Sequence, residues 1–221
     1  MRERNRMKKA ISTAILLFVL GLFVSNANAE LITISLSATV NYARDDGGYL
    51  EGKIDVGSII TGSYTYESTT PDSKPETWGG DYWHYSSPAG VFLSVGGFEF
   101  KTDLENVAFC VSVRDNTPDD VYAIGSSNNS LLSNGVSVES IWWQLNDHTH
   151  TAFSSDALPV TEPVLRQWQA NVLDIEGEQG GYHLMAEVTS VEIIPEPVTF
   201  LLFVTGFTGI RLINNRKSRQ L

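Results

Sequence analysis

The sequence predicts an all-β fold, a jelly-roll-like β-sandwich that lies between two apolar terminal segments. Apolar and polar residues alternate with period two over much of the chain between Leu31 and Ile194. Clusters rich in Gly, Pro, Asn, Asp and Ser separate the alternating segments, and no long amphipathic helical pattern is present. Many short strands with regular turn signals are typical of β-sandwiches. We therefore expect residues 30–193 to form one domain, with residues 1–29 and 194–221 outside it.

The first expected strand, residues 31–40, shows the alternation most clearly. Ile32, Ile34 and Leu36 fall on one face, and the intervening threonines and serines fall on the other. The first and last strands are expected to lie near one another. Further strands are expected over residues 49–56, 59–68, 90–96, 98–101, 106–114, 120–126, 136–145, 166–177 and 182–194.

Charge is distributed unevenly along the chain. Residues 30–197 contain six basic and 25 acidic residues, which is a formal charge near −19, whereas both ends are basic. Such a body would repel nucleic acid and anionic membrane surfaces, so we expect no nucleic-acid partner. Solubility after export explains the charge, and a cation-dependent role is the alternative.

The N-terminal segment, residues 1–29, has the organisation of a secretory signal peptide. A basic opening precedes an apolar run over residues 10–24, and Ala27 and Ala29 stand at the small positions that a signal peptidase accepts. We expect cleavage after Ala29. The alternative is an uncleaved anchor, although the run is shorter than the ~20 residues of a spanning helix. Met7 opens a second leader-like sequence, so the start could be Met1 or Met7.

The C-terminal segment is expected to hold a single transmembrane helix over residues 198–213. A helix of this length covers about 24 Å, somewhat less than a hydrocarbon core of about 30 Å, and Arg211 can extend to the headgroups. The basic end would stop transfer and stay in the cytoplasm. The body is therefore expected on the opposite, outer side of the membrane. This end consists of Arg211, Arg216, Lys217 and Arg219.

Two prolines around a carboxylate, Pro195-Glu196-Pro197, precede this apolar segment. Each proline disfavours helix at the preceding residue, so the approach to the membrane is stiff and extended. The order of this motif, apolar segment and basic end resembles the PEP-CTERM sorting signal of Gram-negative bacteria, many of which make exopolysaccharide. The body also resembles β-rich ectodomains of such proteins in "VGSIITGSYTYESTTPDS" and "TAFSSDALP". That second resemblance implies no known activity.

The PEP-CTERM resemblance implies processing by exosortase, a membrane protease or transpeptidase that would recognise Pro195, Glu196 and Pro197. We therefore expect a non-enzymatic exported protein, anchored in the inner membrane as an intermediate and then released to the cell surface or extracellular matrix. A permanent anchor that is never trimmed is the alternative. Signal peptidase and exosortase are the expected partners, together with exopolysaccharide if the body binds glycans.

The densest aromatic stretch, "WGGDYWHYSSP", is a candidate glycan contact. Its flat rings could stack on sugars from a loop, which would make the body a lectin-like module, or they could close the open end of the sandwich. Trp142 and Trp143 are adjacent, so on a strand they face opposite sides and at least one belongs to the core. The candidate contact residues are Trp78, Tyr82, Trp83 and Tyr85.

No bound metal or cofactor is expected. Zinc would need His148 and His150, next to Asp147, to converge with His84 or His183. Calcium on the acidic loops at residues 44–48 and 114–120 is an alternative, but turn chemistry explains these residues equally well.

No catalytic residues are expected. Cys110, the only cysteine, lies in an apolar alternating run and is predicted to be a small buried residue. The sequence lacks a Gly-x-Ser-x-Gly motif, a His-Glu-x-x-His motif and a phosphate-binding glycine loop. A surface glycoside hydrolase that uses paired carboxylates remains an alternative.

Overall fold

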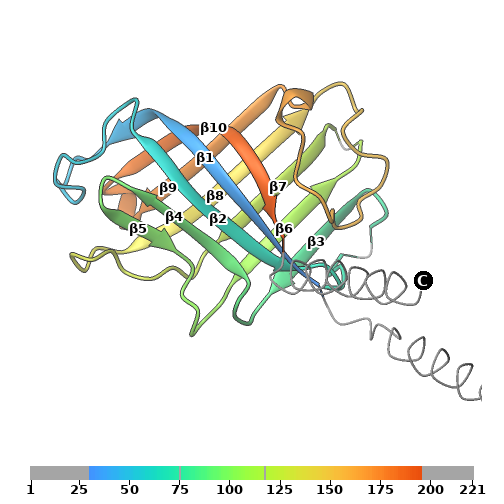
Figure 1. Ribbon diagram of the computed structural model, residues 1–221, viewed down its shortest axis with the longest axis horizontal. Coiled ribbons are helices and arrows are strands. Elements are labelled where there is room, and N and C mark those ends of the chain that lie inside the picture. Colours follow the sequence, from blue (N-terminus) through green and yellow to red (C-terminus); the bar gives the residue numbers. More distant parts are fainter. Residues whose placement is uncertain (1–29, 75, 117, 196–221) are drawn as a thin grey trace, which may run out of the picture. The chain divides into compact units, whose positions relative to one another are not determined.

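The computed structural model describes residues 30–195 except Pro75 and Thr117, and these residues form an all-β domain (Figure 1). This confirms the all-β part of the predicted fold class. Two short 3-10 turns, Leu165–Gln167 and Glu178–Gly180, flank β9. The strands are β1 (Leu31–Arg44), β2 (Ile59–Glu67), β3 (Gly79–His84), β4 (Gly90–Val95), β5 (Phe98–Lys101), β6 (Phe109–Arg114), β7 (Asp120–Ser126), β8 (Val138–Asp147), β9 (Ala170–Gly177) and β10 (His183–Ile194).

All ten strands belong to one antiparallel sheet, in the order β3-β6-β7-β8-β9-β10-β1-β2-β4-β5. The sheet curls, so that β1 and β2 lie across from β6, β7 and β8 (Figure 1). Its inner face packs on itself: the Tyr64 hydroxyl on β2 lies 2.9 Å from the Tyr122 hydroxyl on β7. One curled sheet therefore takes the place of the two separate sheets that we predicted. Alternation identifies the buried face of each strand, but it does not say which strands pair.

The core lies between the facing halves of this sheet. On β1, the predicted inward residues Ile32, Ile34 and Leu36 are buried. Large aromatic side chains fill the centre, and the Tyr64 and Trp143 rings meet edge to face with their centroids 5.9 Å apart. Such contacts contribute to stability beyond the apolar area that they bury.

Two segments differ from the sequence prediction. Residues 49–56 were expected to form a strand but form turns, because Glu51 and Gly52 adopt positive φ angles of 56° and 63°. Just before this segment, the Asp45 carboxylate accepts hydrogen bonds from the backbone N–H groups of Tyr49 and Leu50, at 2.7 and 2.8 Å. Residues 79–84, expected in a loop, form the edge strand β3, which pairs with β6.

The first and last strands are neighbours, as predicted. β1 and β10 pair from Thr33 opposite Ile194 to Arg44 opposite His183, so the two ends of the domain lie together. Pro195, the last described residue, is exposed. No helix among residues 30–195, apart from positions 75 and 117, is long and apolar enough to cross a membrane. Several predicted positions lie outside the described residues: Ala27, Ala29, Glu196, Pro197, Arg211, Arg216, Lys217 and Arg219.

Candidate functional site

A row of residues crosses the outer face of the sheet over five adjacent strands. Strand register places Trp83 opposite Cys110, Cys110 opposite Gly125, Gly125 opposite Trp142, and Trp142 opposite Asp174. Because alternate residues of a strand face opposite sides, these side chains share the face that points away from the core. The row connects an aromatic groove at one end with a second hollow, beside two carboxylates, at the other.

The aromatic groove lies between Trp83 on β3 and Trp142 on β8. These strands are three positions apart in the sheet, which separates their backbones by about 14 Å. Gly125 leaves room between them, since a Cβ atom there would lie 2.5 Å from the Trp142 ring. The groove has a volume of about 280 Å³ and is mostly apolar. It is lined by Asp81, Trp83, Cys110, Ser112, Arg114, Gly125, Ser126, Ser127, Ser140, Ile141 and Trp142.

The aromatic rings at the groove are accessible. Trp83 and Trp142 are each 38% exposed and Tyr85 is 72% exposed. The Trp83 and Tyr85 rings stack, with an interplanar angle of 8° and centroids 6.1 Å apart. The Trp142 indole N–H donates to Gln144 Oε1 at 3.2 Å, which orients the ring. Flat, exposed rings with polar groups beside them suit the apolar face of a sugar ring.

A charged cluster closes one end of the groove. The Asp81 carboxylate accepts from the Ser112 hydroxyl at 2.7 Å and from the Arg114 guanidinium at 2.8 Å, and pairs with the Lys74 ammonium at 2.8 Å. Burial raises the pKa of Asp81, but the hydrogen bonds from Lys74, Ser112 and Arg114 together bring it below its ordinary value. The carboxylate is therefore ionised, and its negative charge is compensated by the two neighbouring cations, Lys74 and Arg114.

Cys110 is buried, as predicted, but it lies on the outer face beneath the groove and not in the core. Burial raises the pKa of its thiol to about 11. A thiol with such a pKa stays protonated at neutral pH, so it is a poor nucleophile.

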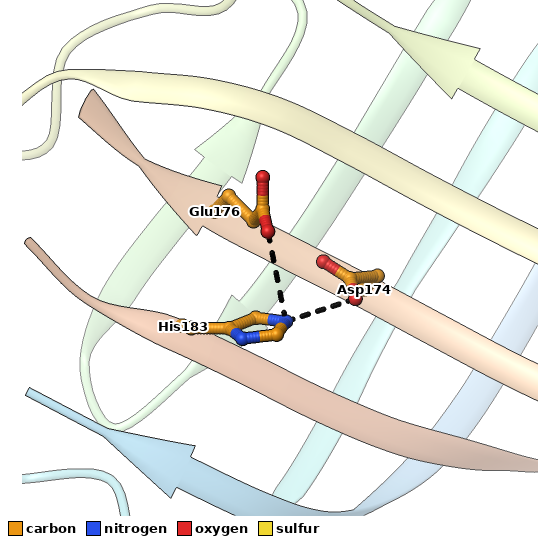
Figure 2. A group of neighbouring side chains, drawn as sticks. All are labelled: Asp174, Glu176 and His183. Atoms are coloured by element: carbon orange, nitrogen blue, oxygen red, sulfur yellow. Dashed lines mark hydrogen bonds and ion pairs between the residues drawn. The ribbon is translucent and has the colours of Figure 1, made fainter. Parts of the chain in front are cut away.

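At the other end of the row, Asp174 and Glu176 on β9 point toward His183 on β10 (Figure 2). His183 Nε2 lies 2.9 Å from Asp174 Oδ2 and 3.9 Å from Glu176 Oε1. The turn between the strands passes through Gly180 at φ 69°, and the resulting register sets His183 directly opposite Glu176.

A hollow of about 460 Å³ adjoins these carboxylates. Because Asp174 and Glu176 are alternate residues of one strand, they project from the same wall. The hollow is lined by Ser140, Trp142, Gln144, Asn146, Val172, Asp174 and Glu176.

The structure separates the aromatic residues that were predicted together. Trp83 and Tyr85 lie on the outer face, whereas Tyr82 is buried and its hydroxyl donates to the Asp156 carbonyl at 2.7 Å. Trp78 is exposed but lies outside the groove lining, with the Lys74 ammonium 6.0 Å from its ring centroid. Tyr85 also lies outside the groove lining, although it stacks on Trp83, and Trp142 is the second tryptophan that lines the groove.

The residues suggested for zinc do not converge. His148 pairs with Asp119, with Nδ1 2.9 Å from Oδ2. His84 is buried on the inner side, and burial lowers its pKa to about 4. Within residues 30–195, positions 75 and 117 aside, Asp174, Glu176 and His183 are the group whose geometry suits a metal ion.

The acidic loop residues have structural partners. Asp120, at the end of the 114–120 loop, is fully buried and accepts from the backbone N–H groups of Asn116 and Phe153, both at 2.9 Å. Asp147 is also fully buried, and hydrogen bonds from the Thr149 hydroxyl and from backbone N–H groups lower its pKa well below its ordinary value. These carboxylates therefore organise turns, as Asp45 does in the 44–48 loop.

A further hollow, of about 610 Å³, lies among the turns beside β8 and shares Ser127 with the lining of the aromatic groove. Its lining is largely polar and contains no aromatic ring, so it offers no stacking surface. It is lined by Asp103, Asn106, Ser127, Asn128, Asn129, Ser137, Val138, Glu139 and Gln179.

The cluster of Asp174, Glu176 and His183 was not predicted from the sequence. The signal was present: "LDIEGEQGGYH" alternates two carboxylates before a glycine-rich turn, and a tight hairpin brings the following histidine back to them.

Comparison with protein-family models, curated proteins and solved structures found no match for this chain.

Proposed function

We propose that this chain is a non-enzymatic exported protein that carries a PEP-CTERM-type signal for processing by exosortase. The observation that carries the proposal is the order of Pro195-Glu196-Pro197, an apolar segment and a basic end, in a chain that also has a leader. The accessible end of β10 supports it, because Pro195 is exposed directly after the last paired residue, Ile194. A protease that binds its substrate as an extended backbone needs such access.

In this proposal the leader directs export and is removed after Ala29, and residues 198–213 hold the chain in the inner membrane. Arg211, Arg216, Lys217 and Arg219 stop transfer on the cytoplasmic side. Exosortase then acts near Glu196 and passes the β domain to the cell surface or matrix.

The test replaces the motif and follows the chain through fractionation. Glu196→Ala and Pro197→Ala are expected to leave the unprocessed form in the inner membrane, while Glu192→Ala, an exposed carboxylate on β10, is processed normally. Intact-mass measurement distinguishes the trimmed chain from a permanent anchor. If both motif variants reach the same compartment at the same mass as the wild-type chain, the sorting role is refuted.

A second function, glycan binding, is favoured by the aromatic groove. Trp83 and Trp142 present two exposed rings with hydroxyl groups between them, which is suited to stacking on sugars. A body with a formal charge near −19 repels polyanions. We therefore expect a neutral polysaccharide as the ligand.

Affinity electrophoresis in gels containing neutral or acidic polysaccharide, including that of the native cell, tests this function. Trp83→Ala and Trp142→Ala are expected to abolish retardation by the neutral polymer, and Trp78→Ala, equally exposed but outside the groove, is expected to retain it. Equal mobility of all variants would exclude the groove. Release of reducing sugar would instead indicate a glycoside hydrolase.

A further inference from the structure

We propose that Asp174, Glu176 and His183 bind a divalent transition-metal ion on the outer face of β9 and β10. This site is independent of the sorting signal, and its test does not depend on glycan binding. One imidazole nitrogen and two carboxylate oxygens converge there, and all three lie within 4.8 Å of one another (Figure 2).

The separations suit a metal ion at the centre of the cluster. Bonds of about 2.0–2.2 Å to nitrogen and oxygen place ligand atoms roughly 3–4 Å apart. His183 Nε2 is 2.9 Å from Asp174 Oδ2 and 3.9 Å from Glu176 Oε1. The three atoms therefore need only small side-chain movements to share one ion.

The backbone under the cluster is held by the sheet. His183 is paired with Glu176 across the β9–β10 ladder, and Asp174 stands two residues before Glu176 on the same face. The Tyr42 ring on β1 meets the His183 ring edge to face, with centroids 5.4 Å apart, and restricts its rotation. A ligand set on paired strands is better defined than one on loops.

The ligand types indicate the class of ion. Imidazole nitrogen is suited to zinc, cobalt or nickel, whereas calcium and magnesium prefer oxygen ligands alone. Water completes the coordination shell from the side of the hollow that adjoins both carboxylates. The site is partly exposed, with side-chain exposures of 21% for His183, 26% for Asp174 and 48% for Glu176, so an ion can enter from solvent.

An ordinary ion pair between His183 and Asp174 is the competing explanation for this cluster. The role of Glu176 distinguishes an ion pair from a metal site. The His183–Asp174 ion pair, already formed at 2.9 Å, gains little from the Glu176 carboxylate at 3.9 Å. A metal ion, in contrast, needs the Glu176 carboxylate as its third ligand. The chain contains an internal comparison in His148, which has the same 2.9 Å contact to one carboxylate, that of Asp119.

The experiment titrates the full chain in detergent with Zn²⁺ and with Co²⁺, by calorimetry and by absorption spectroscopy. One equivalent is expected to bind, with weaker binding of Ca²⁺ and Mg²⁺. His183→Gln, Asp174→Asn and Glu176→Gln are each expected to weaken Zn²⁺ binding at least about 10-fold, since even groups that only support metal ligands have effects of that size. His148→Gln is the matched control and is expected to bind as the wild-type chain does.

A second readout follows the imidazoles directly. The chain has four histidines, so long-range ¹H–¹⁵N spectra contain four imidazole signal sets, and Zn²⁺ is expected to shift the set that His183→Gln removes. Thermal melts of the metal-free variants check folding, and Glu176→Gln, the most exposed change, keeps the test valid if His183→Gln unfolds. Unchanged Zn²⁺ affinity in Glu176→Gln, loss of binding in His148→Gln, or no shift of the His183 signals would each overturn the proposal.

Discussion

Trp142 and Trp143 are neighbours in sequence but belong to opposite faces of the sheet. Trp143 is fully buried, its indole N–H donates to Asn171 Oδ1 at 2.9 Å, and its ring contacts Tyr64 and Tyr122. Trp142 is 38% exposed and lies over Gly125. One tryptophan therefore stabilises the domain, whereas the other is available to a ligand.

The same contrast holds for the ionisable groups. The buried carboxylates of Asp120 and Asp147 are occupied by backbone donors, whereas Asp174 and Glu176 meet at a solvent-accessible imidazole. The buried carboxylates on the inner face thus stabilise the fold. Substitutions on the two faces should separate stability from binding.

The largest expected effect is that of truncating the inner tryptophan. Trp143→Ala should lower the free energy of unfolding by about 3–5 kcal/mol, because it leaves a cavity in the core. Trp142→Ala should change it by less than about 1 kcal/mol and affect only ligand binding. Denaturant unfolding measures both. Equal losses for the two variants would contradict the separation of the faces.

Acid should destabilise the inner face through His84. Burial lowers the pKa of this imidazole to about 4 from an ordinary 6.5, and no hydrogen-bond partner for its Nε2 atom occurs within the described part of the chain. The unfolded chain therefore binds the proton more strongly. The contribution of His84 to the free energy of unfolding is fully present above pH 6.5 and is lost as the pH decreases toward 4, by about 3 kcal/mol.

Thermal melts between pH 7.5 and pH 4 test this effect, with His84→Phe as the comparison. The variant lacks the titrating group and should lose less stability over that interval. Identical slopes for the wild-type chain and His84→Phe would show that other groups set the acid response.

A smaller effect is expected for the buried tyrosine pair. Tyr64→Phe removes a hydroxyl that lies 2.9 Å from the Tyr122 hydroxyl and leaves the latter without this partner, at a cost of about 1–2 kcal/mol. Tyr85→Phe, on the exposed outer side, should be neutral within about 0.5 kcal/mol. Chemical denaturation of both variants measures the difference, and a neutral Tyr64→Phe would show that the pair contributes little.

A small effect on stability is also expected at Gly125. A methyl group there meets the Trp142 ring at 2.5 Å, and the half-exposed ring can move aside. Gly125→Ala should therefore change the free energy of unfolding by less than about 1 kcal/mol but narrow the groove and weaken glycan retention. Strong retention by this variant would show that the groove does not hold the sugar.

The sequence was sufficient for the properties of single strands. Alternation in residues 31–40 predicted the buried face of β1, and the adjacency of Trp142 and Trp143 predicted that they divide between faces. Residues 79–84 were not recognised as a strand, because glycines and turn-forming residues precede a short aromatic run. Alternation within that strand explains why Trp83 is exposed and Tyr82 is buried.

The outer-face sites depend on pairing between strands, which alternation does not determine. Trp83 and Trp142 are 59 positions apart in sequence and share a groove only because β3, β6, β7 and β8 pair in that order. The cluster of Asp174, Glu176 and His183 depends on a single hairpin and was within reach of sequence reasoning. Predicting the cluster required the strand register that follows from the turn at Gly180.

The position of β10 within the sheet has a mechanical consequence. β10 lies between β9 and β1, and its pairing with β1 reaches from His183 to Ile194. Antiparallel hydrogen bonds run perpendicular to the strands, so tension applied at Pro195 along β10 is shared by many of them at once. A domain tethered by this end would therefore resist drag from flowing liquid, because many hydrogen bonds of the β1–β10 ladder would have to break together. A terminal strand pulled perpendicular to its own direction would instead lose its hydrogen bonds one after another.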